Sequence, residues 1–88
     1  MVKIEDIIIQ FWIIKMKNLF YAGGFEGFFS DNVDSFSYET TPSKADAKLI
    51  FIEEEANYIA EKVHGKLIHS HKKLIEISNI LKNQELKI

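Results

Sequence analysis

The feature that most restricts the fold is a run of β-branched and aromatic side chains near the start of the chain. Isoleucine loses rotamer freedom in a helix and packs well on a pleated strand, so the run favours a strand with apolar neighbours on both faces. It comprises Ile7, Ile8, Ile9, Phe11, Trp12, Ile13 and Ile14. A helix is the alternative, because five apolar residues also follow helical spacing: Ile4, Ile7, Ile8, Phe11 and Trp12.

This strand must belong to a small unit. The chain has 88 residues and no cysteine, so we expect one domain, residues 1–88, without disulfides or thiolate-bound metal. Small secreted domains usually need disulfides, which favours a reducing, intracellular setting. The apolar run ends at Ile14 and is far shorter than the roughly 20 residues that cross a bilayer, so no membrane partner is expected.

The residues after the first strand predict a hairpin. Lys17 and Asn18 are typical of a turn, and Leu19–Ala22 of a second strand. Two glycines are then expected to end this strand, and residues 23–32 to form a glycine-rich aromatic loop. The polar segment 31–44 is turn-prone, with room for one short strand at residues 35–38.

The clearest helix runs from Glu53 to His64. Its first turn holds three glutamates, which the helix dipole favours there, and Gly65 follows at the expected left-handed stop position. A brief strand at residues 48–51 is expected before it, and another at residues 66–71 after it. One face of the helix is apolar: Ile52, Ala56, Ile59 and Val63.

Together these elements predict an α+β fold. We expect a small antiparallel sheet, made from the N-terminal hairpin and the later strands, with the helix of residues 53–64 packed across it. Leu74, Ile77 and Leu81 fall on one helical face, which indicates a C-terminal helix. A short strand at residues 74–77 is the alternative, and residues after Lys82 are expected to fray.

The residues that could carry chemistry have simpler structural explanations. His69 and His71 would share one strand face and could hold zinc with a carboxylate, but they also fit an exposed face, and His64 fits a helix end. The glutamates at 53–55 stabilise a helix start. Without cysteine, and without a serine in a nucleophile-elbow setting, we predict no catalytic residues, no metal site and no cofactor.

Charge argues against direct nucleic-acid binding. All 11 basic residues are lysine, and arginine is the residue that reads guanine edges and grips phosphate. Residues 1–61 hold 11 acids and 5 lysines, whereas residues 62–88 hold 2 acids and 6 lysines. After Tyr21 the chain carries acids and no lysine before Lys44, which would repel a phosphate backbone.

The aromatic loop is the predicted contact site. Three phenylalanines within five residues are hard to bury entirely in so small a domain, and exposed aromatics with polar neighbours mark partner surfaces. Burial in the core is the alternative. The negative charge would suit a basic partner surface, such as a nucleic-acid channel. The predicted contact residues are Phe25, Glu26, Phe28, Phe29, Asp31 and Asp34.

Three segments together form a recognisable pattern: a hairpin from Phe11 to Gly24, the sequence ADAKLIF at 45–51, and EEEA to AEKVHGKLI over 53–68. The pattern resembles short accessory proteins of phages and mobile elements of low-GC Gram-positive bacteria. It departs from them at Ile52, where a capping side chain is usual, and beyond Lys72. The resemblance implies a protein of the bacterial host cytoplasm that binds a host protein, for example as an anti-CRISPR-like inhibitor of a defence effector.

Two other functions fit the sequence. A nucleotide or small-ligand binder could use Gly23, Gly24 and Gly27, although this loop lacks the lysine and Ser/Thr of a phosphate loop. A homodimeric structural or regulatory module could bury the doubly apolar first strand by self-association.

Overall fold

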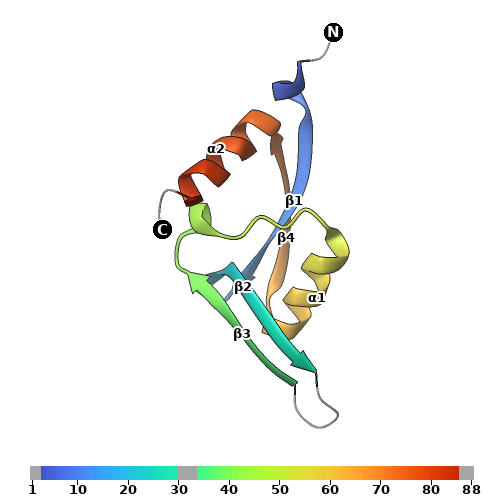
Figure 1. Ribbon diagram of the computed structural model, residues 1–88, viewed down its shortest axis with the longest axis vertical. Coiled ribbons are helices and arrows are strands. Elements are labelled where there is room, and N and C mark those ends of the chain that lie inside the picture. Colours follow the sequence, from blue (N-terminus) through green and yellow to red (C-terminus); the bar gives the residue numbers. More distant parts are fainter. Residues whose placement is uncertain (1–2, 30–33, 86–88) are drawn as a thin grey trace.

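The computed structural model describes residues 3–29 and 34–85, with side chains described outside 26–36 (Figure 1). Four strands form one antiparallel sheet in the order β3-β2-β1-β4, and two helices accompany it. The predicted α+β class is therefore confirmed. In chain order the elements are η1 Ile4–Asp6, β1 Ile8–Met16, β2 Leu19–Phe29, β3 Asp34–Thr41, η2 Lys44–Asp46, α1 Glu53–Val63, β4 Lys66–Lys73 and α2 Leu74–Glu85.

Strand β1 is the centre of the fold, and its middle part is covered on both faces. Ile14 packs into the cluster that contains the apolar face of α1, whereas Phe11 and Ile13 pack into a second cluster with Ile77 of α2. Because side chains alternate along a strand, these clusters lie on opposite faces, here called the α1 side and the α2 side. The strand interpretation of the isoleucine run is confirmed, and the helix alternative is wrong.

Strands β1 and β2 stay paired only next to their turn, where Lys15 lies opposite Phe20. Further along, the segment 47–51 lies between them. Trp12 and Ile50 exchange backbone hydrogen bonds of 2.7 and 2.9 Å, and the Lys48 amide donates to the Tyr21 carbonyl at 2.9 Å. The brief strand expected at 48–51 is thus reduced to one bridge, because the segment meets a different strand on each side.

Strand β2 does not end at its two glycines. Gly23 and Gly24 have φ angles of 102° and 68°, and the pairing with β3 shifts register around them. Glycine tolerates this backbone, so the strand bulges and continues to Phe29. The loop expected at 23–32 is therefore wrong for residues 23–29, and β3 is longer than the expected strand at 35–38.

Helix α1 begins at Glu53 as predicted, without a side-chain cap from Ile52. Its left-handed stop residue is His64, with φ 57°, and not Gly65. Position 65 requires a glycine for a different reason, because a Cβ atom there would overlap Ile14 Cγ2. The glycine at this position is set by the close packing of the chain against β1.

The C-terminal helix is confirmed as α2, and the alternative strand at 74–77 is wrong. Residues 66–71 were expected to form a strand, and β4 continues to Lys73. The helix also continues past Lys82 to Glu85, so the expected fraying does not begin there. Residues 86–88 lie outside the described part of the chain.

Candidate binding sites

The middle of the α1 side is closely packed around Ile14. Ala56 and Ala60 are both buried, and their small side chains let α1 approach Ile14 on the sheet. Tyr21 belongs to the same cluster. Burial raises the pKa of its phenol above 10.0, a backbone hydrogen bond from Phe25 opposes the rise, and the nearby Glu55 carboxylate adds to it.

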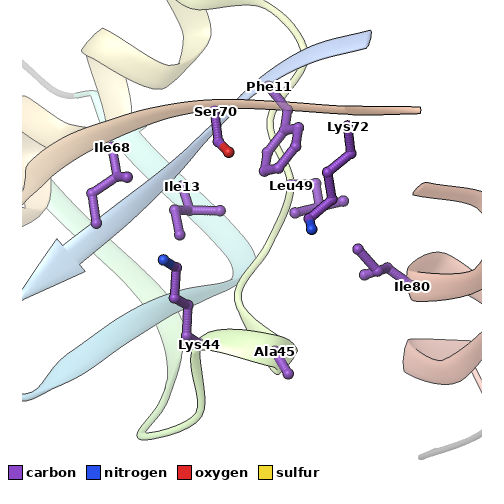
Figure 2. A pocket seen from close by; sticks show the side chains of 9 residues that line it. All are labelled: Phe11, Ile13, Lys44, Ala45, Leu49, Ile68, Ser70, Lys72 and Ile80. Carbon is purple, nitrogen blue, oxygen red and sulfur yellow. The ribbon is translucent and has the colours of Figure 1, made fainter. Parts of the chain in front are cut away.

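The α2 side contains a pocket of about 420 Å³, here called the α2-side pocket. Strands β1 and β4 form one wall, η2 and the segment after it another, and α2 contributes Ile80 (Figure 2). Most of the lining is apolar. The complete set is Phe11, Ile13, Lys44, Ala45, Leu49, Ile68, Ser70, Lys72 and Ile80. On the α1 side, a hollow of about 450 Å³ near the β1–β2 turn is wider open, which makes it a poorer binding site.

The polar groups of the α2-side pocket are two lysines and one serine. Lys44 comes from η2 and Lys72 from β4, and Figure 2 shows both ammonium groups directed toward the space between them. Ser70 lies on the same face of β4 as Lys72, since the two are separated by one residue. No carboxylate belongs to the lining, so the pocket is apolar with positive charge.

Helix α2 is held over this side of the sheet at both ends. The Leu74 amide donates to the Ile7 carbonyl at 2.8 Å. Near the other end, Gln84 Nε2 donates to the carbonyl oxygens of Ala47 at 3.0 Å and of Ala45 at 3.4 Å. Between these anchors only Ile77 of the helix is buried, so the pocket remains beside its middle.

The predicted contact residues do not all form one exposed loop. Phe25 is half-buried against the α1-side cluster, with its ring centroid 6.0 Å from that of Tyr58 at an interplanar angle of 80°. It therefore supports the fold. In the backbone register Phe28 lies opposite Ser35 and Phe29 opposite Asp34. The side chains of Glu26, Phe28, Phe29 and Asp34, and all of Asp31, lie outside the described residues.

The histidines have separate environments. His69 stacks on Trp12 with ring centroids 4.9 Å apart and an interplanar angle of 13°, and its Nε2 lies 3.1 Å from Gln10 Oε1. His64 ends α1. Among the described residues, no three histidine, aspartate or glutamate side chains come together as metal ligands.

The sheet order separates the charged segments. Residues 18–43, which span β2 and β3, contain acids and no lysine. Strand β4 at the opposite edge contains Lys66, Lys72 and Lys73 and no acid. The charge difference between the two parts of the sequence thus becomes a difference between the two edges of the sheet.

No protein-family model, curated protein or solved structure matches the chain. In the described part of the chain, no helix has the length and apolar character needed to cross a membrane.

Sequence reasoning missed the lysines of the α2-side pocket. The alternation of Ile68, Ser70 and Lys72 could have placed these three side chains on one strand face. Nothing in the sequence, however, indicated that Lys44 from a distant turn would face them. The surplus of lysine in the last third of the chain was the only available signal.

Proposed function

We propose that the chain is a non-enzymatic protein that binds another protein through the far part of its β2–β3 ribbon. This part, here called the arm, comprises residues 23–29 and 34–39. Its shape carries the proposal: the molecule measures 55 × 26 × 21 Å, and at one end of its long axis, opposite η1, the end of the arm extends past α1 (Figure 1). The radius of gyration is 14.6 Å, against about 12 Å for a compact chain of this length.

The arm's sequence suggests the chemistry of the partner. Acids without an intervening lysine suit a basic protein surface and repel nucleic acid. The resemblance to phage accessory proteins adds a class of partner, a bacterial defence protein with a basic channel for nucleic acid. On this proposal the chain is an inhibitor that occupies such a channel. The acids of the region are Glu26, Asp31, Asp34 and Glu39.

The test uses a double variant, Phe28→Ala with Phe29→Ala, at the end of β2. Partners captured from host lysate by the natural chain are identified, purified and titrated against both proteins. We expect the double variant to lose binding at least about tenfold while its circular dichroism spectrum is unchanged. Unchanged affinity of the purified partner would rule out the arm as the contact site.

Phe25→Ala is a fold control and not a binding test. Phe25 packs on Tyr58, so its removal should lower stability through lost packing on α1. A double variant in the α2-side pocket, Lys44→Ala with Lys72→Ala, is the matched control for a distant site. It should bind the protein partner as the natural chain does.

The alternative of self-association has little support in the middle of β1. Ile14 is fully buried by the α1-side cluster, and Ile13 is buried on the α2 side. A second copy is therefore not needed to cover this part of the strand, whereas Ile8 at its start is 53% exposed. Light scattering at two concentrations tests the point, and a monomer at both is the expected result.

A further inference from the structure

We infer that the α2-side pocket binds a small organic anion with an apolar body, a carboxylate of the fatty-acid type. The juxtaposition that carries this inference is Lys44 and Lys72 directed into one apolar pocket that has no carboxylate in its lining. The pocket lies on the opposite face of the sheet from α1, and this inference is independent of the arm.

The size of the pocket selects the ligand class. A dry cavity of about 150 Å³ holds benzene, so 420 Å³ corresponds to about 15 non-hydrogen atoms. This volume also falls within the usual range of small-molecule sites, about 300–1,000 Å³. A carboxylate with a ten-carbon chain is therefore of a suitable size, whereas an inorganic anion would leave the apolar wall uncovered.

The apolar wall suits the body of such a ligand. Phe11, Ile13 and Leu49 are nearly inaccessible residues at the base of the pocket, and Ile68 and Ile80 line it from β4 and α2. Covering this wall removes apolar surface of ligand and protein from water, which favours binding in proportion to the area covered.

The two lysines suit the negative end. Among the described side chains, no ion pair of Lys44 or Lys72 is found, and the neighbouring Lys73 pairs with Asp6 at 3.7 Å. A carboxylate between Lys44 and Lys72 would accept hydrogen bonds from both, and Ser70 can donate a third.

The experiment is calorimetric titration of the full chain with decanoate, below the concentration at which decanoate aggregates. Decanol is the matched uncharged probe, and acetate is the matched anion without a chain. We expect decanoate to bind at least about tenfold more tightly than decanol, and acetate to give no measurable binding. Equal binding of decanol and decanoate, or no decanoate binding, would overturn the inference.

Two double variants locate the site. Lys44→Ala with Lys72→Ala should weaken decanoate binding at least about tenfold. Lys66→Ala with Lys73→Ala changes the net charge equally but leaves the pocket lining intact, so it should retain the affinity of the natural chain. If both variants lose affinity equally, the anion binds the general positive charge of the β4 edge, and the pocket site is wrong.

A third variant tests the apolar wall without altering charge. Ile80→Phe would enlarge the side chain that α2 contributes to the pocket. We expect weaker decanoate binding with an unchanged circular dichroism spectrum. Unchanged affinity in this variant would mean that the ligand chain does not lie beneath α2, and would contradict the proposed placement.

Discussion

Helices α1 and α2 have nearly the same length, 11 and 12 residues, yet they cover the two faces of the sheet very differently. Helix α1 buries four side chains: Ala56, Ile59, Ala60 and Val63. Helix α2 buries only Ile77 and leaves Ile75 and Leu81 exposed. Both helices have apolar residues at helical spacing, so spacing alone does not determine how closely a helix packs.

Small residues explain much of the difference. Two alanines on α1 and Gly65 after it allow the backbone to come close to Ile14. The face that α2 presents contains isoleucine, and its ends are held by hydrogen bonds to Ile7 and to the η2 region. The middle of α1 therefore packs directly on Ile14, whereas the middle of α2 lies beside the α2-side pocket.

The largest effect should come from the close contact between α1 and Ile14. Ile14→Ala removes a side chain with no exposed surface, and the rigid contact with α1 should prevent the cavity from closing. We expect a loss of about 4 kcal/mol in the free energy of unfolding, measured by denaturant titration. A loss below about 2 kcal/mol would mean that α1 can move inward and that the α1 side is not rigid.

Gly65→Ala should be the next most damaging change. The new methyl group meets Ile14 Cγ2, so either the strand or the helix end must shift, at a cost of about 2–3 kcal/mol. Lys66→Ala, one residue later at an exposed position, is the matched control and should cost under about 0.5 kcal/mol. Equal stability of the two variants would show that the contact with β1 is easily relieved.

On the α2 side, Ile77→Ala should cost about 2 kcal/mol, the low end for a buried isoleucine. The helix beside a pocket can settle toward the sheet and close part of the space. The same denaturant titration measures the loss in the free energy of unfolding. The difference between this loss and that of Ile14→Ala decides whether the two faces differ. If Ile77→Ala costs as much as Ile14→Ala, the two faces are equally rigid.

The smallest effect should be a response to alkaline pH. Because the folded pKa of Tyr21 lies above 10.0, the unfolded chain loses this proton first. Stability from this group is complete below pH 10 and declines as pH rises from 10 through the folded pKa. Tyr21→Phe should reduce the fall in stability between pH 9 and 11, measured by thermal unfolding. An identical fall in both proteins would contradict the shifted pKa.

Short sequence patterns were sufficient to predict the strand and the helix that depend mainly on neighbouring residues. The β-branched run gave β1, and four-residue apolar spacing with initial glutamates gave α1. Gly23 and Gly24 were wrongly expected to end the second strand, because consecutive glycines usually mark a turn. Their role as a bulge depends on pairing with β3, which adjacent residues cannot reveal.

The candidate sites depend on tertiary structure even more strongly. The predicted contact set included Phe25, but that residue packs on Tyr58, which lies more than thirty positions later in the chain. The α2-side pocket joins Lys44 to Lys72 and depends on how far α2 stays from the sheet. The spacing of residues in the sequence predicts neither the Phe25 contact nor the pocket, because both arise from packing between distant elements.

The segment that lies between β1 and β2 has a consequence for how the chain folds. The Trp12 amide is bonded to Ile50, and the Tyr21 carbonyl to Lys48, so the N-terminal hairpin completes its bonding only when a much later segment arrives. Such a contact must overcome the entropy of closing a long loop, which slows folding. It also joins both ends of that loop into one cooperative unit. The amide protons of Trp12 and Ile50 should then exchange with solvent in a single opening event.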